Sequence, residues 1–319
     1  MTLKDPNPPA IFGLGLDNRL DFCRELIGSG EKPTASERRE AAGLKLVVFD
    51  ALAKAIESGV PKSAALLWAD HDLGEGALLR GRAMSLSVAV ALERQGINGA
   101  SELSLAGAAD AWAAITKINA QYGSVRLTYN FADPVAHKEN VRTQLQAILG
   151  KCQDAGKQLI IELAPHSTPT QLEEAGGTLT ASLHTQLLVE GMRELQDAGI
   201  EPAIWVVNPP SDLLAAATVA AQAYVDGRSN VRVLFQVGAE PDPGRTTAAL
   251  SRLDRALTKL AARTTGVSGI VAGPDAFFGV LNRLHHGSVT REDAVEAISA
   301  HFKKLWDVYS EANKTSGVV

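Results

Sequence analysis

Eight short apolar runs, separated by longer stretches with helical periodicity, constrain the fold of this chain more than any other feature. Between most of the runs lie alanine-rich amphipathic stretches such as 38–58, 138–155, 180–198 and 246–264. Strands that alternate with helices predict a parallel sheet, and eight such units favour an α/β fold closed into a (β/α)8 TIM barrel over an open doubly wound sheet. The runs are 8–16, 63–70, 84–92, 124–130, 158–165, 202–208, 231–238 and 268–274.

The chain carries no proline-rich or serine-rich linker, so we expect residues 1–319 to form a single barrel domain. A long helix is predicted over 291–313. Thr290 stands at its N-cap position, and Glu292 and Asp293 lie in its first turn, where negative charge stabilises a helix. We expect this C-terminal helix to close or buttress the barrel.

The charge balance and the cysteines limit the partners and the compartment. A formal net charge of -5 provides no basic footprint, so nucleic acid is not an expected partner. The apolar runs are strand-sized and interrupted by charge, and the first ten residues lack an apolar signal core, so no membrane association is expected. Cys23 and Cys152 stand in helix-like contexts without zinc spacing, which predicts buried thiols and a cytoplasmic location.

Charged residues at the strand ends are the candidates for chemistry, because the active site of such a barrel lies at the C-terminal ends of its strands. Asp17 follows the first strand, Arg126 lies in the fourth, and Glu162 lies within the apolar run of the fifth. A carboxylate in such a run needs a cation, and Arg126 on the neighbouring strand is the obvious partner. We predict that Asp17 and Glu162 are the acid/base groups and that Arg126 stabilises an anion. The alternative is a buried ion pair that only fixes strand register.

Other polar and glycine residues after the strands are predicted to bind the substrate. Gly238 and Gly273 stand after the seventh and eighth strands, where backbone N–H groups usually hold a phosphate. The predicted substrate-binding residues are Arg19, Asp70, Asn130, His166, Asn208, Gly238 and Gly273.

Two patterns resemble cofactor sites, but neither is strong enough to predict one. Asp70, His71 and Asp72 look like metal ligands, but neighbouring residues of a loop rarely converge on one ion without a further ligand from elsewhere. The glycines of 13–15 do not open a helix with G-x-G-x-x-G spacing, so a nicotinamide cofactor is not supported. We therefore expect no metal and no cofactor.

Several motifs, in their order along the chain, resemble the class I Schiff-base aldolases of the tagatose-bisphosphate aldolase type. The closest likeness is to the aldolase-like domain fused to a sugar kinase in bacterial inositol breakdown. The family's first strand ends in Asp-x-Arg, which Asp17 and Arg19 match, and its fifth strand carries a proton-transferring glutamate, which Glu162 matches. The motifs are FGLGLDNR (12–19), LLWADHDLG (66–74), VRLTYN (125–130), LIIELAPH (159–166), AGIEPAIWVVN (198–208), GIVAGPDAFFGVL (269–281) and GSVTREDAVEAISAHF (287–302).

The chain departs from this family at the lysine that forms the Schiff base, at a lysine near the reaction centre and at the arginine that binds the substrate phosphate. Val206 stands where the sixth strand has the Schiff-base lysine, Arg126 replaces a lysine of the fourth strand, and Gly273 precedes Pro274 where the family has Gly-Arg. Neither valine nor arginine supplies an amine that can lose a proton and form an imine. The lysines nearest to strands in the sequence are expected on helices or at N-terminal strand ends, the wrong side of the barrel: Lys45, Lys117 and Lys157.

The resemblance and these departures leave three functions open. The first is an aldolase-like enzyme that performs carbon–carbon cleavage or related enolisation without an imine, on a small carbohydrate or sugar acid with or without phosphate. The second is a catalytically inactive homologue that binds a sugar or a partner. The third is a metal-dependent lyase that uses Asp70, His71 or Glu162. A homo-oligomer is expected because barrels of this family often associate.

Overall fold

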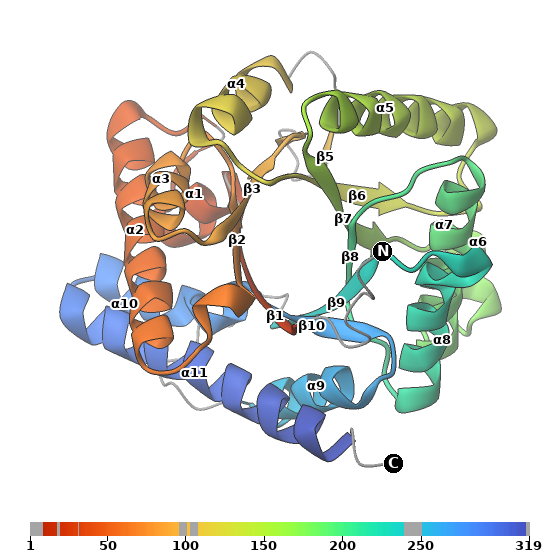
Figure 1. Ribbon diagram of the computed structural model, residues 1–319. Helices are drawn as coiled ribbons and strands as arrows, with labels where there is room; N and C mark the ends of the chain where they lie inside the picture. Colours follow the sequence, from red (N-terminus) through yellow and green to blue (C-terminus); the bar gives the residue numbers. More distant parts are fainter. Residues whose placement is uncertain are drawn as a thin grey trace, which may run out of the picture.

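Eight parallel strands close into a barrel, in the order β1-β10-β9-β8-β7-β6-β3-β2 around the ring (Figure 1). The computed structural model describes residues 9–17, 20–30, 32–95, 101–102, 108–238 and 251–316. The predicted (β/α)8 barrel is confirmed, and each of the eight predicted runs overlaps one barrel strand. The strands are β1 (Ile11–Leu16), β2 (Ala65–Ala69), β3 (Ser87–Ala91), β6 (Tyr122–Tyr129), β7 (Gln158–Pro165), β8 (Ile204–Val207), β9 (Arg232–Val237) and β10 (Val267–Ala272).

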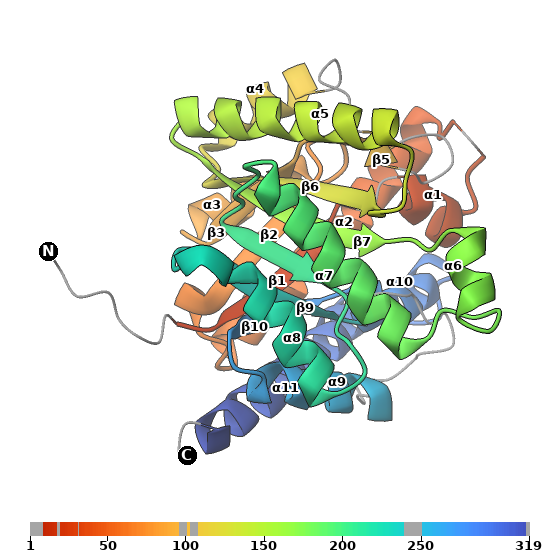
Figure 2. The same ribbon diagram turned by 90° about the vertical axis from the view of Figure 1, so that its right-hand side faces the viewer.

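Helices surround the barrel on its outside, as Figures 1 and 2 show. A small antiparallel pair, β4 (Arg94–Gln95) and β5 (Ser101–Glu102), lies between β3 and α4 in the chain and was not predicted. The helices are α1 (Leu20–Ile27), α2 (Ala35–Glu57), α3 (Glu75–Ala83), α4 (Ala108–Ile118), α5 (Val135–Asp154), α6 (Pro169–Glu174), α7 (Ala181–Asp197), α8 (Leu213–Ala223), α9 (Arg252–Arg263), α10 (Phe278–His285) and α11 (Arg291–Ser316).

The C-terminal helix α11 buttresses the barrel as expected. It packs between α2 and α9 (Figure 1). Its Phe302 and Trp306 rings meet Phe12 of β1 edge to face, with ring centroids 6.0 and 6.3 Å apart. The helix begins at a cap that the sequence predicts, because Thr290 Oγ1 accepts a hydrogen bond from the Asp293 N–H at 3.1 Å.

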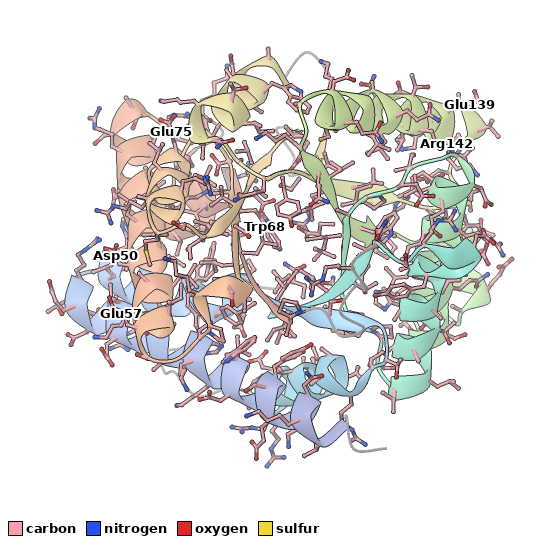
Figure 3. All side chains as sticks on the ribbon, viewed as in Figure 1. Asp50, Glu57, Trp68, Glu75, Glu139 and Arg142 are labelled. Carbon is pink, nitrogen blue, oxygen red and sulfur yellow. The ribbon has the colours of Figure 1, made fainter. Side chains whose placement is uncertain are left out.

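The interior of the barrel is packed with apolar side chains rather than open. Alternate strand residues face inward, and the indole of Trp68 lies among them (Figure 3). A Cβ atom on Gly13 or Gly15 of β1 would lie 3.0 or 3.1 Å from this ring, so the two glycines make room for it. The inward layer consists of Ile11, Leu66, Trp68, Ala89, Ile160, Ile204, Val206, Leu234 and Val271.

Two predictions from the composition can be compared directly with the structure. Cys23 and Cys152 are buried, free thiols. Among the helices that the structure describes, none combines the length and the apolar character needed to cross a membrane.

Candidate active site at the barrel mouth

The C-terminal ends of the strands bring Glu162 and Arg126 side by side. The two residues are register partners on β7 and β6, so both side chains point inward near the top of the packed layer. Arg126 Nε lies 3.5 Å from Glu162 Oε1. The Glu162 side chain is only 10% exposed, whereas that of Arg126 is 49% exposed. The carboxyl group is therefore enclosed while the guanidinium faces the barrel mouth.

Burial governs the ionisation of Glu162. Loss of hydration raises the pKa of this carboxyl to about 7, although the positive charge of Arg126 acts to lower it. The negative charge of Asp17 raises the pKa further, which places Asp17 within electrostatic reach of Glu162. Asp17 directly follows β1 and is half-buried. The three predicted catalytic residues thus lie at one end of one barrel, and Glu162 can exchange a proton near neutral pH.

Val206 occupies the inward position beside Glu162 on β8 and is fully buried. The apolar side chain completes the packed layer. The sequences of the eight barrel strands contain no lysine. No imine-forming amine therefore projects from a barrel strand.

The position expected for one lysine was wrong. Lys45 lies on α2, as predicted, but its long side chain reaches the C-terminal ends of β1 and β2. Its Nζ donates to the Leu16 carbonyl oxygen at 2.5 Å and forms an ion pair with Asp70. Both charged side chains are 0% exposed, so neither the amine nor the carboxylate is open to a substrate. Lys117 lies on α4 and Lys157 precedes β7, both as expected.

Asp70 and Asn130, two predicted substrate contacts, are engaged inside the protein. Besides its pairing with Lys45, Asp70 accepts hydrogen bonds from the N–H groups of Asp72 and Leu73 at 2.9 and 2.6 Å. It thereby shapes the turn after β2, and we give it a structural role in place of substrate binding. Asn130 is likewise fully buried.

The Asn130 amide joins the loops that follow β6 and β7. Its Nδ2 donates to the His166 carbonyl oxygen at 2.7 Å and to Gln171 Oε1 at 2.6 Å, and its Oδ1 accepts from the Ala132 N–H at 2.8 Å. These contacts use both the nitrogen and the oxygen of the Asn130 amide, so this side chain positions the neighbouring loops rather than a substrate.

His166 is held by a carboxylate that sequence analysis missed. Its Nε2 lies 2.9 Å from Asp133 Oδ1, and Asp133 Oδ2 accepts from the Asn130 N–H at 3.0 Å. Because a carboxylate only accepts hydrogen bonds, we assign the ring proton to Nε2. Nδ1 is then the ring nitrogen without a proton, and it is buried and has no hydrogen-bond partner among the residues that the structure describes. His166 follows Glu162 by four residues and extends past the same strand end.

A third carboxylate, Glu93, was also missed. It follows β3 by two residues, and the ladder to β6 continues through a 2.8 Å hydrogen bond from the Leu92 N–H to the Ser124 carbonyl oxygen. Extending this register places Glu93 level with Arg126, and Glu93 is buried. Arg126 thus lies on the strand between those of Glu93 and Glu162.

The remaining predicted contacts lie at other strand ends. Asn208 directly follows β8 and is half-buried, and its Oδ1 has no hydrogen-bond partner in the described part of the chain. Gly238 follows β9 in a left-handed conformation (φ 69°), and Gly273 follows β10. Arg19 lies outside the described residues.

The Asp70-His71-Asp72 triplet does not converge on one point, because Asp72 pairs outward with Arg38 of α2 at 2.5 Å while Asp70 is enclosed with Lys45. Across the described ranges, no group of three or more His, Cys, Asp or Glu side chains is placed to hold a metal ion.

Comparison with solved structures finds the same fold in Schiff-base aldolases. A Schiff-base-forming fructose-1,6-bisphosphate aldolase studied through its reaction intermediates is 11% identical, with a TM-score of 0.53 over 94% of each chain. An archaeal fructose-1,6-bisphosphate aldolase is 10% identical, with a TM-score of 0.51 over 94% of each chain. Cgl0159 from Corynebacterium glutamicum is 12% identical, with a TM-score of 0.50 over 92% of this chain and 85% of that one.

Scans with protein-family models and against curated proteins gave no match. At such low identities, the structural likeness establishes the (β/α)8 fold alone. The chemistry has to be argued from the residues of the barrel mouth.

Proposed function

We propose that this protein is an aldolase-like enzyme that acts on a small carbohydrate or sugar acid by moving a proton next to a carbonyl group, without forming an imine. The observation that carries the proposal is Glu162, a buried carboxyl with a pKa of about 7 that lies beside Arg126 and within electrostatic reach of Asp17. A general base works best when its pKa lies near the working pH. Carboxyl groups whose pKa burial raises toward neutrality gather at functional sites.

Each residue then has a defined task. In enolisation, the Glu162 carboxylate takes a proton from the carbon next to the carbonyl, the electron pair moves to the carbonyl oxygen, and Arg126 stabilises the enediolate. In cleavage, the base takes the proton of the β-hydroxyl, the bond between Cα and Cβ breaks, and its electron pair forms the enolate. Asp17 or the protonated Glu162 then returns a proton to carbon.

His166 is a second proton-transfer group in this proposal, because Asp133 fixes its ring just past the end of the strand that carries Glu162. Asn208 and Arg19 complete the proposed substrate contacts. The tagatose-bisphosphate aldolases and the kinase-fused aldolase-like domain are the relatives that the motifs suggest. We also expect the protein to be cytoplasmic and to form a homo-oligomer. Light scattering on the purified protein would test the oligomeric state.

The buried Val206 favours a second candidate, a homologue that binds a sugar and does not turn it over. Here the charged residues of the mouth would bind ligand hydroxyl and carboxylate groups only. Such a protein would bind members of a sugar panel, yet neither release a product nor exchange a substrate proton.

Borohydride trapping with keto-sugars and their phosphates separates these functions, read by intact mass beside product detection with and without chelator. The proposal expects turnover that resists chelator and leaves no adduct. A stable adduct on a lysine would overturn the argument from Val206, and chelator-sensitive turnover would point to a metal-dependent lyase. Binding without turnover would support the second candidate.

The pH dependence of kcat/KM provides a sharper prediction. Only the ionised Glu162 can accept a proton, so kcat/KM should rise with pH and level off above about 7. Glu162→Gln should lower kcat/KM by at least about 100-fold, a usual contribution of a general base. Glu139→Gln on α5 removes an exposed carboxylate far from the mouth (Figure 3) and should change nothing.

A further inference from the structure

A cavity of about 680 Å³ opens at the rim of the barrel mouth, between the loop after β6, helix α6 and the first turns of α7. Helix α6 lies at the end of the barrel toward which β6 and β7 point (Figure 2). The volume falls within the range that is usual for small-molecule sites. The described lining of the cavity includes none of the residues proposed for proton transfer, so the proposed function leaves this cavity unexplained.

The chain builds one wall of the cavity from two capped helices and the turn between them. Thr168 caps α6 in a reciprocal pair with Gln171, and Thr180 caps α7. Gly176 and Gly177, between the two helices, take left-handed conformations with φ of 84° and 88°, which glycine adopts without a steric penalty. The local sequence thus fixes where each helix begins.

Hydrogen bonds hold α6 against the loop after β6, so this wall is formed before any ligand binds. Gln171 Oε1 accepts from the Thr168 N–H at 2.9 Å and from Asn130 Nδ2 at 2.6 Å. Asn130 Nδ2 also donates to the His166 carbonyl oxygen. A ligand therefore does not have to order this wall, and that reduces the free energy that binding costs.

An apolar surface forms part of the lining. Phe131 and Leu183 both line the cavity. Leu183 is buried, whereas Phe131 is half-buried and keeps part of its ring accessible. An aromatic ring supplies a flat apolar surface against which the C–H face of a sugar ring can pack.

Four further lining residues carry polar side chains that the protein does not use. Across the part of the chain that the structure describes, none of the four makes a side-chain hydrogen bond or an ion pair. All four are exposed. They are Thr170, Glu174, Ser182 and Gln186.

These four side chains match the hydrogen-bonding properties of sugar hydroxyl groups, which both donate and accept. The hydroxyls of Thr170 and Ser182 and the amide of Gln186 can also do both, and the carboxylate of Glu174 accepts. Binding sites for small molecules typically combine an apolar surface with a few such polar groups. Together with the Phe131 ring, this lining suits an amphipathic ring that carries several hydroxyl groups.

We propose that this cavity binds a sugar ring through its hydroxyl groups, at the rim of the mouth and apart from Glu162 and Arg126. The inference goes beyond the proposed function, because a sugar would bind here whether or not the mouth moves protons.

Backbone amide NMR tests the site with four probes: glucose, fructose, ethanolamine and inorganic phosphate. Either sugar should shift the amide signals of Ser182 and Gln186, with a Kd of about 1–10 mM, as expected from a few hydrogen bonds and one aromatic contact. Unshifted signals with both sugars at about 100 mM would overturn the inference. Shifts caused by ethanolamine or phosphate, but by neither sugar, would overturn the class of ligand.

Two variants locate the sugar within the cavity. Gln186→Ala removes an exposed amide, so the protein should fold normally, and sugar binding should weaken by about tenfold. Phe131→Ala removes the apolar surface and should weaken binding at least as much. Gln153→Ala, in the last turn of α5, also removes an exposed amide and is the matched control that should leave binding unchanged. Equal binding by the wild type, Gln186→Ala and Phe131→Ala would contradict the proposed site.

Glu162→Gln separates this inference from the proposed function. The variant should lose proton transfer and keep the sugar-induced shifts of Ser182 and Gln186. Shifts that disappear in Glu162→Gln would overturn a site apart from the mouth. Shifts that persist in a protein without any turnover would refute the proposed function alone.

Discussion

At the scale of single residues, Glu162 links the proposed chemistry to the stability of the fold. An unfolded chain ionises this carboxyl near its ordinary pKa of about 4.3, whereas burial in the native protein raises the pKa to about 7. Between these values the native state retains a proton that the unfolded state has lost. Stability contributed by this group is therefore present below about 4.3 and falls as the pH rises to about 7, beyond which it is constant.

Glu162→Gln should remove this pH dependence. Between pH 4 and pH 8, titration of this residue should lower the free energy of unfolding of the wild type by on the order of 3 kcal/mol. The variant should not show this decrease. Urea denaturation of both proteins across this range measures the difference, with Glu139→Gln as the control. Parallel stability curves for Glu162→Gln and the wild type would show that Glu162 titrates normally.

Some site residues could be predicted from the sequence and others could not, for physical reasons. Arg126 and Glu162 stand out because ionised groups are rare in apolar strands. Glu93 directly follows the predicted run 84–92, as Asp17 follows the first run, so the same signal could have found it. Asp133 lies in a polar loop, where a carboxylate is ordinary, and only the fold brings it to His166. Asp70 was assigned to the substrate because its partner Lys45 lies on a helix and stands 25 residues earlier in the chain.

At the scale of elements, the glycines of β1 are explained by the strand beside it. Gly15→Ala places a Cβ atom 3.1 Å from the Trp68 indole within a packed layer. We expect it to cost about 1–3 kcal/mol of the free energy of unfolding, as overpacking usually does. Gly43→Ala in α2 is the matched control, because its Cβ meets nothing within 4 Å and alanine favours a helix by up to about 1 kcal/mol. Equal effects of the two changes in urea denaturation would contradict this packing.

The Lys45–Asp70 pair connects α2 to the ends of β1 and β2. Lys45→Met should cost about 3–5 kcal/mol, because it leaves a buried carboxylate without its cation. Lys45→Met combined with Asp70→Asn should recover part of that loss, since the asparagine is neutral and its oxygen can still accept from the turn. Urea denaturation of the two single variants and the double variant measures the coupling, and losses that simply add would contradict it.

Periodicity predicted the strands and most helices because each element buries one repeated face. The pair β4–β5 escaped prediction because two-residue strands carry no periodicity. Periodicity also could not predict which end of the barrel Lys45 reaches, because that depends on the tertiary contacts of its long side chain.

At the scale of the whole molecule, the barrel has the fold that Schiff-base aldolases also have, and its eight strands carry no lysine. Val206 completes the apolar packing, and Glu162 and Arg126 lie level with it on the neighbouring strands, within electrostatic reach of Asp17. The account therefore places the chemistry in proton transfer at the strand ends rather than in covalent attachment of the substrate.

Exchange of substrate protons with deuterated water tests this claim most directly, followed by NMR on keto-sugars. The account predicts that wild-type protein incorporates deuterium at the carbon next to the carbonyl without a borohydride-trapped adduct, and that Glu162→Gln does not. Exchange that survives in Glu162→Gln, or that requires a trapped lysine adduct, would contradict it.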